Sequence, residues 1–401
     1  MIDAVSILAV LGLAAWLFHP GMLRSDLWRA VGTPLASIIG SGFLVSVPIL
    51  RDLYGGWAVL AMAGLLAVAY LVGGAVRENI LHVEPLLADH EGGRVLASLE
   101  RLSHLVLAFA YFVSVAYYLV LFASFLLKPF GIADDGTAVK TVVTALLAVI
   151  GGVGLWRGFR AVEGLEIYAV SAKLAVIGGL VAGLALHDWH IMGETGTLLP
   201  AGHFEESSLP VLLGLLILVQ GFETSRFLGD TYSPGLRVRT MKLAQLLSTA
   251  IYLVFFALMT PLFAVETPAG GVAAIVDMLA PVSIALPLLV LFGALASQSS
   301  AAIADTLGAG GLLHDIAGQR IALRHIYPLI AVVAGIVTWQ TDVYSLITFA
   351  SRCFAVYYAL QCMVAALSAA RRGSKARAAS FAALTLVCTA IVVFGTPVEG
   401  G

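Results

Sequence analysis

Two short runs of glycine and polar residues interrupt apolar stretches of this chain. Glycine costs about 1 kcal/mol relative to alanine in a helix, and backbone opened inside hydrocarbon leaves N–H and C=O groups unpaired at several kcal/mol each. Such a break is tolerated beside a polar cavity, where the freed groups can bind a solute or an ion. Close packing of small residues is the alternative for the first run. We predict that these residues bind a substrate: Ile39, Gly40, Ser41 and Gly42 in the first run, and Gln220, Gly221, Phe222 and Glu223 in the second.

A lysine lies in the middle of another apolar stretch, SAKLAVIGGL, at position 173. A charge at the centre of a bilayer costs at least about 2.5–3.5 kcal/mol, so the Lys173 side chain should face a cavity or a partner. There it could gain and lose a proton during a transport cycle, which makes it the candidate for ion coupling. The alternative is a structural lysine that stays paired or bonds to backbone carbonyls.

Two residues could contact a substrate through their side chains. Glu223 could gate the cavity, contact a substrate amine or titrate, and it could instead form an ion pair with Arg226, three residues further on. Tyr111 could offer its hydroxyl to a substrate carboxylate, although aromatic packing is the default role of such a residue.

Charged residues near the ends of the apolar stretches are candidates for gates. Arg352 must be paired or solvated, because an arginine is not neutralised in a protein, and it could bind an anionic group or lock an outer gate. Asp305 could take part in a cytoplasmic gate, although ordinary surface charge is an equal explanation. The other residues considered for that gate are Arg24, Arg29 and Asp315.

The composition predicts an all-α polytopic membrane protein. Of the 401 residues, 60% are hydrophobic and 11% are charged, and the mean hydropathy is +0.99. The net charge of −2 gives no footprint for a nucleic acid. The three cysteines form neither a disulfide framework nor a metal motif, and the nine histidines show no paired spacing. We therefore expect neither an enzyme nor a cofactor or metal site.

The apolar stretches predict about twelve membrane crossings. The first, 2–20, is long enough to cross and lacks the basic start and small-residue cleavage site of a signal peptide. The other eleven are 27–49, 56–76, 98–127, 138–156, 161–186, 208–229, 239–264, 280–304, 322–338, 343–369 and 376–395.

The distribution of lysine and arginine predicts the orientation. If the crossing 27–49 begins in the cytoplasm, the cytoplasmic loops carry sixteen of the 22 basic residues and the outer loops carry three, namely Arg51, Lys128 and Lys140. Cytoplasmic loops are enriched in these residues. Both termini are then expected to be extracytoplasmic.

The two interrupted stretches are the first and the sixth of the eleven, which predicts two halves of five helices. Because five is odd, the second half starts on the opposite side of the membrane, as in an inverted repeat. The predicted divisions are an extra N-terminal helix (1–22), a first repeat (23–187), an extracellular loop (188–207), a second repeat (208–370) and a C-terminal helix (371–401).

These motifs resemble those of a known family. The run Ile39–Gly42 resembles the glycine–serine–glycine break in the first helix of amino acid–polyamine–organocation (APC) superfamily permeases, and Gly221–Glu223 resembles the break in their sixth helix. The resemblance covers residues 27–369. It implies a leucine-transporter-type (LeuT-like) fold, a 5+5 inverted repeat with discontinuous helices 1 and 6. In such permeases the carboxylate and the amine of an amino acid lie against the backbone of the two breaks.

The resemblance also implies where a coupling ion acts. Ala172–Leu174 resembles the stretch where some proton-coupled members carry a lysine, which takes the place of a sodium ion between the first broken helix and helix 8. In sodium-coupled relatives, hydroxyls such as those of Ser299 and Ser300 could coordinate the ion. Because a lysine and a sodium ion would compete for one site, Lys173 favours protons. Each serine could instead bond back to its own helix.

We therefore expect a secondary active transporter in the plasma membrane of a prokaryote that imports a small polar solute, foremost an amino acid, together with protons by alternating access. Its partners would be the solute, the proton and the lipid bilayer. A sodium-coupled carrier, or a carrier of an organic anion or cation, is the alternative within the same fold. An integral-membrane enzyme would instead gather polar residues near one membrane face, and a channel would show rings of pore charges.

Overall fold

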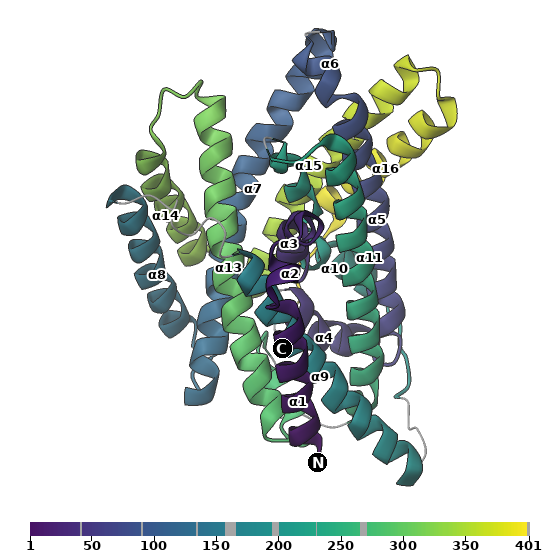
Figure 1. The fold of residues 1–401 in the computed structure, drawn as a ribbon, viewed down its shortest axis with the longest axis vertical. Coiled ribbons are helices and arrows are strands. Elements are labelled where there is room, and N and C mark those ends of the chain that lie inside the picture. The colour runs from purple at the N-terminus through teal and green to yellow at the C-terminus, as the bar shows by residue number, and fades with distance from the viewer. Residues whose placement is uncertain are drawn as a thin grey trace.

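The computed structural model describes residues 1–40, 42–89, 91–133, 135–156, 166–194, 200–229, 231–264 and 271–398. Long helices run side by side along the longest axis of the molecule (Figure 1). The α-helices are α1 (Ile2–Leu17), α2 (Pro20–Leu23), α3 (Asp26–Ile38), α4 (Gly42–Tyr54), α5 (Ala58–His82), α6 (Glu84–Ala88), α7 (Gly93–Leu127), α8 (Gly136–Trp156), α9 (Glu166–Glu194), α10 (Ser208–Leu213), α11 (Pro234–Met259), α12 (Ile275–Leu279), α13 (Ala285–Ile316), α14 (Leu323–Gln340), α15 (Val343–Arg371) and α16 (Lys375–Phe394). The 3₁₀ helices are η1 (Lys128–Phe130), η2 (Leu216–Val219), η3 (Phe222–Leu228) and η4 (Thr260–Ala264).

Within the described residues, nine helical segments are long and apolar enough to cross a membrane, and each coincides with a predicted crossing. In lipid a helix satisfies its backbone groups internally, which is why such apolar runs fold as helices. Three of the predicted crossings fall outside those nine. The crossing 2–20 is the shorter apolar helix α1, the crossing 208–229 is divided into α10, η2 and η3, and the crossing 322–338 is α14.

Several helices are longer than the sequence predicted, and the largest extensions are at the C-terminal ends of α13 and α9. α13 continues to Ile316 instead of ending at 304, so the first charged residue after the apolar run, Asp305, lies inside the helix and is buried. α9 continues to Glu194 instead of 186 and takes up the beginning of the predicted loop 188–207. In both cases the predicted end of the helix is set by the first polar residues after the apolar run. A helix can extend beyond the apolar layer, and a buried polar residue can remain within it when it finds a partner.

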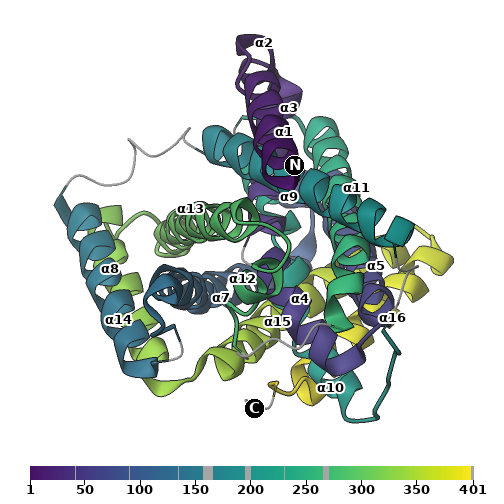
Figure 2. The ribbon, with the colours of Figure 1, turned by 90° about the horizontal axis from the view of Figure 1, so that it is seen from below.

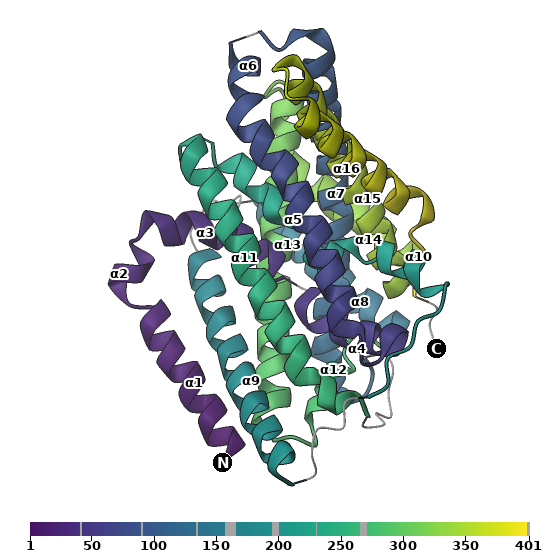
Figure 3. The ribbon, with the colours of Figure 1, turned by 90° about the vertical axis from the view of Figure 1, so that its right-hand side faces the viewer.

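The first broken helix differs in direction from its neighbours. α3 is seen nearly end-on in Figure 1 and from its side in Figure 3, so it runs across the long helices into the middle of the molecule. α7 and α13 lie between the pair α8 and α14 on one side and α9 and α11 on the other (Figure 2).

The ends of the molecule can be named by their short helices. α6 lies at one end (the α6 end), whereas α12 and the N-terminus lie in the other half (the α12 end; Figure 3). α1 packs along α9 and also reaches α13, where the Asp3 carboxylate accepts a hydrogen bond from the N–H of Ala285 at 2.9 Å.

Candidate functional site

The first predicted break is present, because α3 ends at Ile38 and α4 begins at Gly42. Ser41 lies outside the described residues, so its predicted contact with a substrate stays a prediction. A helix end leaves its last carbonyls without partners inside the helix. Here side chains from three other helices reach three of the carbonyls around this end, those of Ala36, Ile38 and Ile39.

Each of these carbonyls has its own donor. The Lys173 ammonium on α9 donates to the carbonyl of Ala36 at 3.0 Å. On α11, the Tyr252 hydroxyl lies 3.1 Å from the Ile38 oxygen, and on α13 the Ser297 hydroxyl donates to the Ile39 oxygen at 3.2 Å. Lys173 is therefore directed at the broken helix, as the sequence suggested. Donors from three helices stabilise the break, which leaves its backbone sensitive to a change in any of them.

A cavity of about 10 Å³ lies beside this end of α3, and its lining includes Gly40, Lys173 and Ser297. A volume of this order accommodates roughly one water molecule. The space next to the lysine therefore matches an ion or a water in size and excludes an organic solute.

The second predicted break lies at Gln220 and Gly221, between η2 and η3. Gly221 has φ of 116°, a left-handed conformation that favours glycine. The following Glu223 is fully buried, and its Oε2 accepts hydrogen bonds from the Gly221 N–H at 3.0 Å and from the Tyr358 hydroxyl at 2.7 Å. Its Oε1 has no hydrogen-bond partner within the described part of the chain. Glu223 therefore has one oxygen to offer to a donor that is not part of the protein.

A cluster of polar and aromatic side chains surrounds the second break. Gln220 donates through Nε2 to the Tyr118 hydroxyl at 3.3 Å and lies 3.5 Å from the Tyr358 hydroxyl through its Oε1. The Phe222 ring stacks on the Tyr358 ring at a centroid distance of 5.0 Å. Residues predicted from the second break are thus gathered with tyrosines from α7 and α15.

The two breaks touch each other. A Cβ added to Gly42 would collide with the carbonyl of Leu218, and one added to Gly221 would lie 2.6 Å from the Cβ of Ser37. Glycine at these positions therefore lets the two backbones approach more closely than a side chain would permit. In this conformation the breaks pack against each other.

The remaining predicted substrate and ion residues lie near this centre with differing contacts. Tyr111 is buried, with its ring edge-on to Phe354 at 5.9 Å. Ser299 and Ser300 donate to carbonyls of their own helix at 2.8 Å and 2.9 Å, those of Leu295 and Ser297. The serine whose hydroxyl points to the broken helix is Ser297, on the same helix as Ser299 and Ser300. The sequence pattern did not distinguish Ser297 from its neighbours.

The predicted gate residues Asp305 and Arg352 contact a serine side chain and a backbone carbonyl, respectively. Asp305 is buried and accepts a hydrogen bond from Ser114 on α7. Arg352 donates through Nε and a terminal nitrogen to the carbonyl of Gly395, at 3.1 Å and 2.5 Å, and so caps the end of α16. The other residues considered for a cytoplasmic gate are exposed: Arg24, Arg29 and Asp315.

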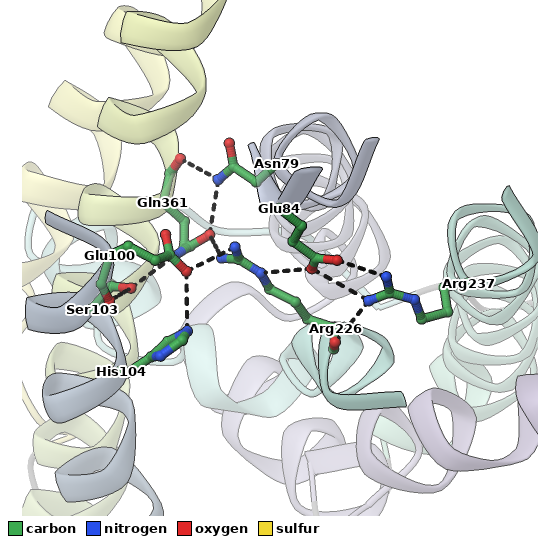
Figure 4. A network of polar contacts seen from close by, with 8 residues as sticks. All are labelled: Asn79, Glu84, Glu100, Ser103, His104, Arg226, Arg237 and Gln361. Carbon is green, nitrogen blue, oxygen red and sulfur yellow. Dashed lines mark hydrogen bonds and ion pairs between the residues drawn. The ribbon is translucent and has the colours of Figure 1, made fainter. Parts of the chain in front are cut away.

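A network of charged and amide side chains lies at the α6 end of the molecule (Figure 4). Arg226 on η3 lies at its centre, 2.7 Å from Glu100 and 3.2 Å from Glu84, and does not form the ion pair with Glu223 that was considered above. Arg237 approaches the other Glu84 oxygen at 2.6 Å. The network is completed by four residues from α5, α7 and α15: Asn79, Ser103, His104 and Gln361.

The geometry of this network joins the second break to five other helices. Arg226 follows Glu223 by three residues on η3, and its partners lie on α6, α7 and α15. Arg237 on α11 also donates to the backbone oxygen of Arg226 at 2.8 Å. Two arginines face two carboxylates, of which Glu100 is buried and Glu84 partly exposed, so the charges of the network balance, as ions taken out of water require.

The opposite end is hollowed. A cleft of about 1710 Å³ lies at the α12 end, lined by α4, α7, α8, α15 and the C-terminal segment, and it includes Pro48, Val120 and Thr396. Val120 follows Tyr118 by two residues on α7. The cleft is thus lined by α4 and α7, the helices that also carry Gly42 and Tyr118 beside the breaks, and it lies at the opposite end of the molecule from the network.

Several residues of the centre were not found from the sequence. Tyr252, Tyr358 and Ser114 are single polar residues within long apolar runs, where packing is the default role. Glu84, Glu100 and Gln361 lie far apart in the chain, so that no spacing joins them. A buried carboxylate near the start of a predicted span, such as Glu100, is the signal that could have led to the network.

Comparison with known proteins agrees with this geometry. A family model described as APC superfamily transporter matches residues 20–395. An uncharacterized protein of Aquifex aeolicus (strain VF5) is 40% identical over 384 residues, which cover 95% of this chain and 93% of the relative.

Solved structures with the same architecture are also transporters. A manganese transporter of Eremococcus coleocola superposes with a TM-score of 0.55 at 14% identity, over 93% of this chain and 87% of that one. A substrate-bound, outward-open Na⁺-coupled sialic acid symporter superposes with a TM-score of 0.53 at 15% identity, over 100% of this chain and 99% of that one. At such identities the likeness shows the fold, which is LeuT-like, with broken helices 1 and 6 and the extra N-terminal helix α1. The protein is a transporter and not an enzyme, and it belongs to the APC superfamily.

Proposed function

We propose that the protein imports a small amine-bearing solute, foremost an amino acid, together with protons. The observation that carries the proposal is the position of the Lys173 ammonium on the carbonyl of Ala36, at the end of the first broken helix and beside Ser297. A lysine that bonds there when protonated favours one arrangement of α3 and α9. Loss of its proton leaves a neutral amine, which bonds the carbonyl more weakly than an ammonium does, and this favours the other arrangement. A proton gradient can thereby drive the change of access.

The groups around the breaks support an amino acid as the solute. α4 begins at Gly42, and the first N–H groups of a helix have no partner inside it, so they suit a carboxylate. The carbonyls near Ile38 and Leu218, together with the unpartnered Oε1 of Glu223, suit an ammonium group.

We further propose that the α6 end faces the cytoplasm of a prokaryote and that the cleft faces outward. The excess of lysine and arginine in loops assigned to that side supports this orientation. The structure would then represent a conformation open to the outside, with the Arg226 network as the closed inner gate. Both termini would be extracytoplasmic.

Uptake by proteoliposomes with an imposed pH gradient tests the proposal. Radiolabelled amino acids would be offered to the wild type, to Lys173→Ala and to Lys242→Ala, which removes an exposed lysine of α11 as a matched control. We expect gradient-driven accumulation by the wild type and Lys242→Ala, and only gradient-independent exchange by Lys173→Ala. Accumulation that follows a sodium gradient at constant pH would contradict proton coupling, and uptake of Mn²⁺ without any amino acid would contradict the solute class.

A further inference from the structure

One tyrosine hydroxyl contacts the backbone of both breaks at once. The Tyr252 hydroxyl on α11 lies 3.1 Å from the carbonyl oxygen of Ile38 and 2.7 Å from that of Leu218. These residues belong to different repeats, and the first is the last residue of α3. The Tyr252 side chain is fully buried, and the edge of its ring packs against the Phe43 ring at 5.2 Å. Its position is therefore set by packing and not by solvent.

The Tyr252 hydroxyl cannot satisfy both carbonyl oxygens, because it has a single hydrogen to donate. A phenol carries one O–H, so Tyr252 can donate fully to one of the two carbonyls at a time. An ammonium group carries three donors and a positive charge. It would satisfy both oxygens together, and it would also be favoured by the negative end of the α3 dipole. The pair of carbonyls is thus better matched to an ammonium than to the hydroxyl that occupies it.

We propose that the Tyr252 hydroxyl is a resident substitute for the amine of the solute. It holds the two breaks together while the site is empty, and the solute's ammonium displaces it. Tyr252 thereby selects for solutes that bring N–H donors, because a solute without them would leave two buried carbonyls without a hydrogen bond. The kind of solute rests on the proposed function, whereas the competition for the two carbonyls does not.

Removal of the hydroxyl should make room for a small amine. In Tyr252→Phe the ring remains, but both carbonyls lose their donor. Methylammonium is the probe, because it offers three N–H donors on a small cation, and tetramethylammonium is its counterpart without N–H groups. We expect methylammonium to raise the unfolding temperature of both proteins, but in Tyr252→Phe the same rise should need about fivefold less methylammonium than in the wild type. A factor of five corresponds to the free energy of one hydrogen bond, about 1 kcal/mol. Tetramethylammonium at equal ionic strength should not show this difference.

Tyr54→Phe is the matched control. Tyr54 is likewise buried, and its hydroxyl donates to a backbone carbonyl, that of Ser208, at 2.9 Å. Both variants should lose a similar amount of stability without ligand, but only Tyr252→Phe should gain sensitivity to methylammonium. A second variant, Phe43→Leu, removes the ring that positions Tyr252 and should show the same gain to a smaller degree, which covers the case in which Tyr252→Phe does not fold.

The outcomes separate the two proposals. Equal responses to methylammonium in the wild type, Tyr252→Phe and Phe43→Leu would overturn the role of Tyr252, as would an equal response of Tyr252→Phe to tetramethylammonium. If methylammonium acts as expected but the wild type in proteoliposomes accumulates no amino acid, the proposed function fails and the inference on Tyr252 holds. If amino acids accumulate but their deaminated analogues accumulate equally well, the inference fails alone.

Discussion

Neutralising Glu100 should open the α6 end of the molecule. In Glu100→Gln, Arg226 keeps Glu84 at 3.2 Å but loses the carboxylate at 2.7 Å, while Gln361 can still accept from it. Removal of one partner of a buried ion pair, which leaves the other charge uncompensated, costs about 3–5 kcal/mol. Because one carboxylate and an amide remain, we expect about 1.5–3 kcal/mol, the value of a hydrogen bond to a charged group. This would shift the population of the open conformation by about 10- to 100-fold.

Cysteine labelling measures that shift. In a background without Cys353, Cys362 and Cys388, Leu107→Cys would place a thiol on α7 between Ser103 and Tyr111, at a position that is now fully buried. Its labelling by a membrane-impermeant maleimide from the α6 end should accelerate by about 10- to 100-fold in Glu100→Gln. Glu205→Gln, an exposed residue near the cleft, is the control and should leave the rate unchanged. An unchanged rate in a folded Glu100→Gln protein would refute the network's role as a gate.

Three further predictions concern the breaks and Asp342, the residue that caps the N-terminus of α15. Gly221→Ala should lower stability by at least about 1 kcal/mol, seen in thermal unfolding, because alanine is strained at φ of 116° and its Cβ would meet Ser37; an unchanged unfolding temperature would contradict this. Ser297→Ala should reduce transport and lower the free energy of unfolding by about 1–3 kcal/mol, because it leaves the Ile39 carbonyl without its donor. In Ser299→Ala the free energy of unfolding should stay within about 0.5 kcal/mol of the wild type, because Ser299 bonds only to its own helix. Equal losses of stability in the two variants would argue against a special role of Ser297. At Asp342, partial burial raises the pKa, but hydrogen bonds from Ser345 and from the Tyr344 N–H outweigh it and hold the pKa below its usual value. The resulting stabilisation is complete above the unfolded pKa of about 4 and is lost as the pH falls through the lower folded value, so Asp342→Asn should lack this acid-dependent loss in a pH series of unfolding temperatures.

The sequence predicted the broken helices well because their signals are local. Glycine and a polar residue inside an apolar run are visible without any neighbour, and α3 and η2 end within a residue of the predicted interruptions. Lys173 was found for the same reason, since a charge in an apolar run must have a partner. The orientation of Lys173 towards α3 was implied by the family resemblance and appears in the contact with Ala36.

The contacts between distant segments could not be predicted in the same way. Asp305 was placed at a helix end because it is the first charge after an apolar run, yet Ser114 from another helix lets it stay buried inside α13. Arg226 was compared with Glu223 because both lie on one segment, while its partners Glu84 and Glu100 come from other helices. Such pairings depend on the packing of helices, which has no local signature in the chain.

Proton movement during solute entry is the most direct test of the account. Wild-type proteoliposomes with a weakly buffered medium would receive an amino acid that they accumulate, and a pH electrode would follow the outside solution. We expect the outside to become alkaline in step with uptake, and expect this signal to vanish in Lys173→Ala. Uptake by the wild type against a concentration difference without any movement of protons would contradict proton coupling through Lys173.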